Sequence, residues 1–229
     1  MNIGQYKSQD RVLLAVDCII FGFDGQQLKA LLIKRGFEPE KGKWSLMGGF
    51  VGQDESTDEA AMRVLHQLTG MSDIYMEQLY CFSDVNRDTA GRIVSVAYYS
   101  LINIEEYNEQ LEQDHEAHWF PLTAVPDLIF DHNQMVNLAK ERLCQKVSNH
   151  PVGFELLPKK FTLPQLLILY EAIFGSGLDK RNFTRKILSL GFLKKLNEKE
   201  KASSRKGAFY YVFDKKKYNK LEHEGIKFV

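Results

Sequence analysis

A segment around residues 49–71 has residue types at spacings that suit phosphate chemistry. Glu55 lies in a short loop after a Gly-Gly pair, and Ser56 with Glu59 forms a capping-box pattern that predicts the start of a helix. Apolar residues then recur at helical spacing until Gly70, which is expected to end the helix. Carboxylates on one face of such a helix would bind hard divalent cations and promote pyrophosphate hydrolysis. The activity of the segment therefore depends on which helix positions carry acids.

The positions that would supply those acids are apolar or neutral in this chain. The segment resembles the Nudix box, which is a Gly, five residues, a Glu, seven residues and then Arg-Glu-apolar-x-Glu-Glu-x-Gly-apolar. The matching residues are Gly49, Glu55, Arg63, Leu65, Gly70 and Met71. Val64, Gln67 and Leu68 occupy the positions of the family's catalytic glutamates. The resemblance covers most of residues 10–145 and implies the Nudix fold, a mixed sheet between helices, without the catalytic set.

Without those glutamates, the resemblance implies a domain that binds a ligand and does not hydrolyse it. Valine and leucine have no lone pairs for a cation and glutamine is neutral, so we expect no metal, no cofactor and no enzymatic activity. Glu55 is interpreted as a loop anchor and Glu59 as a capping residue. The competing hypothesis is an active Nudix hydrolase with an unorthodox set of acids, Glu55, Glu59 and Glu116. Mg²⁺-dependent turnover of diphosphates would distinguish the two hypotheses.

A ligand pocket is expected on the loops that match the substrate side of the Nudix family. The candidate effector-binding residues are Arg35, Lys43, Trp44, Asp84, Arg87, Asp131 and His132. Structural alternatives remain open for them. Trp44, like Phe130, is large enough to be a core residue, and His132 could cap the helix that follows. Arg35 and Lys43 could be solvated.

A second group of residues suits nucleic acid. Apolar residues in 163–174 predict a helix capped by Thr162, and Asp179 is expected to cap another helix that Gly191 ends. Two helices joined by a short Gly-containing turn are typical of a helix-turn-helix. The second helix carries side chains that can read base edges in the major groove. They are Lys180, Arg181, Asn182, Arg185 and Lys186.

The segment after that helix predicts a wing. Phe192–Leu196 and Ala208–Phe213 have the composition of strands, and a polar, basic loop over 197–207 joins them. A strand, a loop and a strand after a helix-turn-helix are the layout of a winged helix. Arg205 and Lys206 in the loop would contact phosphates. A solvated charged face is the alternative explanation for the basic helix, and the strands that follow favour DNA binding over it.

The net charge of zero conceals an acidic part and a basic part of the chain. Residues 1–150 hold 13 Lys and Arg against 22 Asp and Glu, whereas residues 151–229 hold 17 against 8. A polar break at 148–153 coincides with the change of sign. The predicted domains are therefore a Nudix-like effector-sensing domain at 1–150 and a winged helix DNA-binding domain at 151–229. A compact basic module is typical of nucleic-acid binding.

Strands and helices that would position these residues follow from the apolar runs. Strands are predicted at Val12–Phe23, Leu28–Lys34, Lys43–Phe50, Tyr75–Phe82, Arg92–Ile104 and Ala117–Phe120, and a helix at Gln134–Val147. This mixture is typical of an α+β fold. The apolar runs are too short to span a membrane. The three cysteines are far apart and no signal sequence is visible, which favours a cytoplasmic location.

The pairing of the two modules carries the broadest resemblance. The stretch FTLPQLLILYEAIFGSGLDKRNFTRKILSLGFL is similar to the C-terminal domain of the Nudix-related transcriptional regulators, which join a Nudix-like sensor to a winged helix. The resemblance implies a homodimeric repressor that binds double-stranded operator DNA and a small-molecule effector, a sugar or a nucleotide-sugar. The sugar-responsive AraR-type branch suggests a pentose such as L-arabinose that lowers operator affinity. The alternative effector is ADP-ribose or another NAD metabolite.

Overall fold

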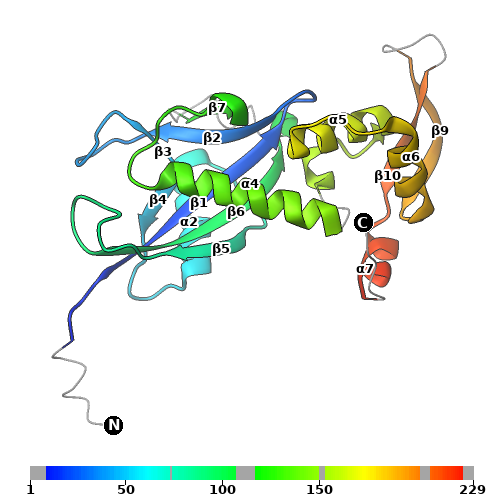
Figure 1. The fold of residues 1–229 in the computed structure, drawn as a ribbon. Helices are drawn as coiled ribbons and strands as arrows, with labels where there is room; N and C mark the ends of the chain where they lie inside the picture. The colour runs from blue at the N-terminus through cyan, green and yellow to red at the C-terminus, as the bar shows by residue number, and fades with distance from the viewer. Residues whose placement is uncertain (1–8, 73, 107–116, 150–152, 202–206, 224–229) are drawn as a thin grey trace.

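The computed structural model describes residues 9–72, 74–106, 117–149, 153–201 and 207–223. Within them, a seven-stranded mixed sheet lies between the helices α2 and α4, and a three-stranded sheet with α5, α6 and α7 follows (Figure 1). This confirms the predicted α+β class, with a mixed sheet between helices followed by a smaller second module. None of the described helices is long and apolar enough to cross a bilayer.

The central strand of the large sheet is β1 (Leu13–Phe23), an almost uninterrupted apolar run. It pairs in parallel with β6 (Ile93–Asn103). With β2 (Leu28–Lys34) it forms the predicted antiparallel hairpin. The Asp24 carboxylate closes the hairpin turn by accepting hydrogen bonds from the backbone N–H groups of Gln26 and Gln27. The other strands of this sheet are β3 (Trp44–Ser45), β4 (Met47–Phe50), β5 (Glu77–Phe82) and β7 (Ala117–Pro121).

The two helices cover opposite faces because strand side chains alternate. Ile19 and Phe21 of β1 belong to the core under α4 (His132–Asn149), whereas Cys18 and Ile20 belong to the core under α2 (Thr57–Thr69). The predicted capping box of α2 is present, and Gly70 ends the helix in the left-handed conformation.

The C-terminal module contains the predicted helix-turn-helix. Its helices are α5 (Leu163–Phe174) and α6 (Lys180–Ser189). Thr162 and Gln165 form a capping box at α5, and Asp179 caps α6 by accepting a hydrogen bond from the Asn182 N–H at 2.7 Å. Both caps are the ones expected from sequence.

The wing differs from the prediction in length. β9 (Leu193–Glu200) extends four residues into the expected loop and pairs with β10 (Ala208–Phe213). Its exposed lysines pack on an aromatic neighbour: the Lys195 and Lys199 ammonium groups lie 3.6 and 4.5 Å from the ring centroid of Phe209. A polar sequence can therefore form this strand.

Two further elements of the C-terminal module carry no clear sequence signal. β8 (Phe161–Thr162) has only two residues and is defined as a strand by its pairing with β10. α7 (Lys215–His223) begins with three lysines and is not among the helices predicted from the sequence. Tyr218 anchors this helix, because its ring is buried against Phe192 and Phe213.

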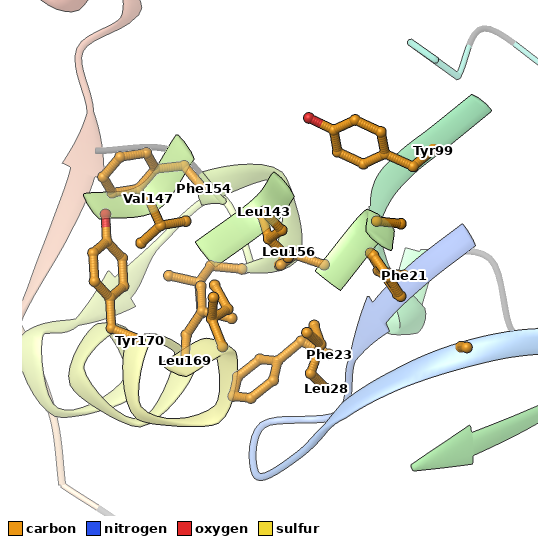
Figure 2. Packing of buried hydrophobic residues seen from close by; sticks show 14 of the residues in the cluster. Phe21, Phe23, Leu28, Tyr99, Leu143, Val147, Phe154, Leu156, Leu169 and Tyr170 are labelled. Carbon is orange, nitrogen blue, oxygen red and sulfur yellow. The ribbon is translucent and has the colours of Figure 1, made fainter. Parts of the chain in front are cut away.

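The two modules share one continuous apolar core (Figure 2). Leu143 and Val147 of α4 lie in the same cluster as Leu156, Leu169 and Tyr170. The Cys144 thiol also donates a hydrogen bond to the Ile173 carbonyl at 3.2 Å. The domain boundary near residue 150 stays a prediction, since residues 150–152 lie outside the described part of the chain.

Truncating this shared core should destabilise the whole chain. Leu143→Ala should lower the free energy of unfolding by about 2–5 kcal/mol, because the fully buried side chain would leave a cavity. The measurement is urea unfolding followed by circular dichroism. Ile168→Ala, on the half-exposed side of α5, is the control and should cost about 1 kcal/mol or less. Equal losses in the two variants would contradict the shared core.

Candidate effector and DNA-binding sites

Several loops that carry effector candidates lie at the end of the large sheet away from the C-terminal module (Figure 1). The β2–β3 loop, the β5–β6 loop and the start of α4 meet there around a pocket of about 700 Å³. Asp84, Arg87 and Asp131, three of the predicted residues, line this pocket. The other lining residues include Glu40, Tyr80, Phe82 and Phe130.

A buried ion-pair network forms the floor of the pocket. The Arg87 guanidinium binds the Asp131 carboxylate through two parallel hydrogen bonds, of 2.9 Å from Nε and 2.7 Å from Nη2. Its Nη2 also lies 3.5 Å from Asp17, which accepts a 2.6 Å hydrogen bond from the Ser95 hydroxyl. Only 3% of the Arg87 side chain is exposed. Such a charge is tolerated in the interior only when paired and hydrogen-bonded.

His132 extends the network and is buried in its neutral form. Its Nδ1 accepts a hydrogen bond from the Leu46 backbone N–H at 3.1 Å, so the ring proton is on Nε2. Nε2 lies 3.5 Å from the Asp17 carboxylate. Burial lowers the pKa of His132 below its usual value despite that carboxylate. His132 is the first residue of α4, so the network ties the helix to β1 through Asp17 and to Ser45 and Leu46 at the end of β3.

The remaining effector candidates lie at the rim or in the core. The Arg35 guanidinium stacks over the Phe37 ring at 4.0 Å and lies 5.4 Å from the ring of Phe130, at the pocket edge. Lys43 is exposed and pairs with Glu40. Trp44 packs edge-on against Phe120, in agreement with the core alternative.

Backbone strain marks the same pocket. Phe130 has a φ of 51°, which is rare for a bulky side chain. Such a conformation costs about 1–3 kcal/mol and persists only where the surroundings impose it. Here it holds the ring between Arg35 and His132, whose ring centroid is 5.9 Å away.

Sequence reasoning missed several of these residues. Asp17 had a detectable signal, because it is the one acid within the apolar β1 run. Gly48 had none: an added Cβ would lie 2.3 Å from the Asp17 carboxylate, so the glycine makes room for the buried acid. Tyr80 and Phe82 have the residue types expected of any strand, so the sequence alone does not single them out. Their position in the pocket wall follows from the place of β5 in the sheet.

The Nudix-like helix contains no set of side chains that fits a divalent cation. Val64 is buried against Gly49, where an added Cβ would lie 2.7 Å from its Cγ2. Leu68 is half-buried in the same core, and Gln67 accepts a hydrogen bond from Arg63. No cluster of three metal-binding side chains occurs in the described part of the chain. Glu116 lies outside it.

The two remaining acids near the helix have structural partners. Glu55 binds Arg63 through hydrogen bonds of 2.8 and 2.6 Å and accepts another from the Gly52 N–H. These contacts, those with Arg63 first, lower the pKa of Glu55 to about 2. Glu59 reaches back to the Ser56 N–H at 2.8 Å. Their interpretation as a loop anchor and a capping residue agrees with this geometry.

The basic helix α6 presents its polar side to solvent. Phe183 and Ile187 are buried, and all five predicted DNA-binding residues of the helix are exposed. The Arg185 guanidinium donates a 3.1 Å hydrogen bond to Asn182, which aligns the two side chains. Arg205 and Lys206, the predicted wing contacts, lie outside the described residues.

Comparisons with known proteins agree with the two-module architecture. Residues 12–139 match the NUDIX domain family and residues 153–213 match the NrtR DNA-binding winged helix domain. The ADPR responsive transcriptional repressor of Acinetobacter baylyi is 34% identical over 214 residues, 91% of this chain and 86% of that protein.

Two solved structures of Shewanella oneidensis NrtR are also similar. The protein complexed with a 27mer DNA has a TM-score of 0.81 and 31% identity, over 90% of this chain and 95% of that one. Its NUDIX domain complexed with ADP ribose has a TM-score of 0.51 and 33% identity, over 62% and 99%. The comparisons confirm the predicted pairing of modules but do not support the resemblance to the arabinose-responsive branch.

The neutral buried histidine should make stability depend on pH. Below the ordinary histidine pKa of about 6.5, the unfolded chain takes up a proton that folded His132 resists, so stability is lost as pH falls from about 7 to 5. The loss should approach at most about 1.4 kcal/mol per pH unit. His132→Gln should remove this slope in urea unfolding at several pH values. His66→Gln, at an exposed position of α2, should keep it; a slope unchanged in His132→Gln would contradict the assignment.

Proposed function

Because this chain belongs to the NrtR family of repressors, in which a Nudix domain is joined to an NrtR winged helix, we propose that it represses transcription in response to ADP-ribose. The observation that carries the proposal is the pairing of a DNA-binding module with a Nudix module that lacks its catalytic acids. ADP-ribose replaces L-arabinose as the effector, since a similar repressor is described as ADPR responsive and a similar Nudix domain was crystallised with ADP ribose.

The pocket around Arg87 and Asp131 suits a nucleotide-sugar. Its volume of about 700 Å³ lies within the usual range for small-molecule sites. The rings of Tyr80, Phe82 and Phe130 offer faces for a base. The Arg35 guanidinium at the rim offers a fork for a phosphate group, which a neutral pentose would not use.

The bound ligand is expected to stay intact. Hydrolysis of a pyrophosphate needs anionic oxygen ligands that hold divalent cations against the phosphates. Val64 and Leu68 offer none, and the Glu55 carboxylate is occupied by Arg63 and Gly52. The Nudix module therefore acts as a sensor.

DNA recognition is assigned to α6 and the wing. Lys180, Arg181, Asn182, Arg185 and Lys186 would enter the major groove, while Arg205 and Lys206 would bind phosphates. A single winged helix contacts too few base pairs for genomic specificity, so we propose that the chain acts as a homodimer on paired half-sites.

Helix α4 connects the two sites mechanically. Asp131 and His132 place its start in the pocket network, and Cys144 and Val147 pack its far end against the winged helix. A helix of 18 residues spans about 27 Å as a rigid rod. If the ligand displaces the first turn of α4 slightly, α5 would shift, and the proposed recognition helix α6 would shift with it. Because coupling is reciprocal, the operator must weaken effector binding by the same factor.

Effector specificity is tested by operator titration. ADP-ribose at saturation should weaken operator binding about 5–150-fold, whereas L-arabinose should have no effect. The measurement is fluorescence anisotropy of labelled operator with the full chain, in parallel with an assay for phosphate products of ADP-ribose in Mg²⁺. No turnover is expected. Turnover lost in Glu55→Gln would support the hydrolase hypothesis, and an unmoved titration curve would reject ADP-ribose as effector.

Recognition by α6 is tested by comparing cognate and random duplexes. Arg181→Ala should cost about 1–3 kcal/mol on the operator and relax its sequence preference, because it removes a base contact. Lys206→Ala should weaken both duplexes alike and flatten the dependence of affinity on salt. Lys140→Ala, on the opposite module, is the matched control for charge. Equal losses of affinity for both duplexes in Arg181→Ala would reject the assignment of α6 as the recognition helix.

A further inference from the structure

One apolar side chain lies on the polar side of α6. Leu188 is 40% exposed, whereas Phe183 and Ile187, the other large apolar residues of this helix, are buried. Leu188 belongs to neither of the apolar clusters that the described residues form. Packing within the described part of the chain therefore does not account for a leucine at this position.

Helical spacing places Leu188 on the same side as the two arginines of α6. Residues three, four and seven positions apart lie on one side of a helix. Leu188 follows Arg185 by three positions, Thr184 by four and Arg181 by seven. Both arginines are exposed, so Leu188 extends their stripe into the last turn. Base-reading side chains in the recognition helix of homeodomains have the same spacing.

The surroundings of Leu188 suit a polyanion. The ten residues of α6 include no acid, and the stripe contains the charges of Arg181 and Arg185. The Ser189 hydroxyl beside Leu188 donates a 2.7 Å hydrogen bond to the Lys186 carbonyl, so its proton is used within the helix. A partner that covers this stripe has to satisfy two guanidinium groups and one apolar side chain.

The major groove of DNA offers this combination. Its base edges present hydrogen-bond donors and acceptors together with one apolar group, the 5-methyl of thymine. Leucine has no donor or acceptor, so the thymine methyl is the feature of the groove that it can select. The seven positions from Arg181 to Leu188 span about 10 Å, which corresponds to about three base steps of 3.4 Å.

We propose that Leu188 is a specificity-determining residue, which contacts the 5-methyl of a thymine within about three base pairs of the base that Arg181 contacts. The inference rests on the proposed function, since it requires α6 to be the recognition helix. Loss of one buried methyl contact should weaken DNA binding about fourfold.

The test removes the methyl from the DNA. The probe is the tightest-binding duplex that the full chain selects from a random-sequence pool. Each thymine in this duplex is replaced in turn by deoxyuridine, which lacks the 5-methyl and keeps the hydrogen-bonding edge. We expect one such replacement to weaken binding about fourfold in fluorescence anisotropy titrations. That thymine should lie within about three base pairs of the position whose preference is relaxed in Arg181→Ala.

The protein side of the contact is tested with Leu188→Ala. This variant should bind the thymine duplex about fourfold more weakly than the original chain, and it should be insensitive to deoxyuridine at the same position. Ile168→Ala is the matched control, because it truncates a similarly exposed apolar side chain on α5; it should discriminate thymine from deoxyuridine like the original chain. A replacement effect that persists unchanged in Leu188→Ala, or no thymine whose replacement matters, would overturn the proposal.

Stability is measured on the same variants. Leu188→Ala should leave the unfolding midpoint almost unchanged, because the side chain is exposed and alanine favours helix. A fall as large as that of Leu143→Ala would show that Leu188 acts through the fold, and would overturn its assignment to DNA recognition.

The selection step separates this inference from the proposed function. A chain that enriches no sequence would contradict sequence-specific DNA binding, and the role of Leu188 would fall with it. A chain that enriches a sequence and loses its preference in Arg181→Ala, but responds to no thymine methyl, would keep the proposed recognition helix and overturn only the role of Leu188. ADP-ribose takes no part in these titrations, so the outcome does not depend on the proposed effector.

Discussion

The apolar face of α4 has to be buried against two partners at once, and the arrangement of the molecule depends on this. Along most of its length the helix covers the sheet beside Phe21, and near its end Leu143 and Val147 pack against α5. Because dispersion and apolar burial act at every point of this contact, the helix cannot tilt on the sheet without disturbing the winged helix. The two modules are therefore coupled by a packed interface and are not independent domains joined by a flexible linker.

The polar start of α4 is held as firmly as its apolar face. Arg87 lies between Asp131 and Asp17, and His132 closes the network from the other side. Buried charges of this kind add little net stability compared with apolar packing, but they are costly to disturb singly. Their arrangement is thus sensitive to any ligand that competes for one member, which suits the sensor role proposed for this pocket.

Much of the fold was predictable because its signals are local. The hairpin at Asp24, the capping box at Ser56 and the cap at Asp179 act within a few residues, and each appears in the structure. The features that the sequence did not predict depend on contacts between residues that are far apart in the chain. α7 is held by Tyr218 against Phe192, and the pairing of Asp17 with Arg87 joins residues 70 positions apart. For the pocket, three of the seven effector candidates line one cavity, and their role stays a prediction. Trp44 packs against the core, as the structural alternative for this residue allows.

The degenerate Nudix box shows how a catalytic motif can be retained as structure. Arg63 fixes the loop by binding both Glu55 and the Phe50 carbonyl, at 2.9 Å for the latter. Val64 fills the space over Gly49 with apolar contact. A glutamate at that buried position would need a cation to offset the cost of burying its charge. With valine there, the position offers no ligand to a cation, while Arg63 and Glu55 keep the geometry of the loop. This geometry is consistent with the proposed function, in which the Nudix module holds its ligand intact.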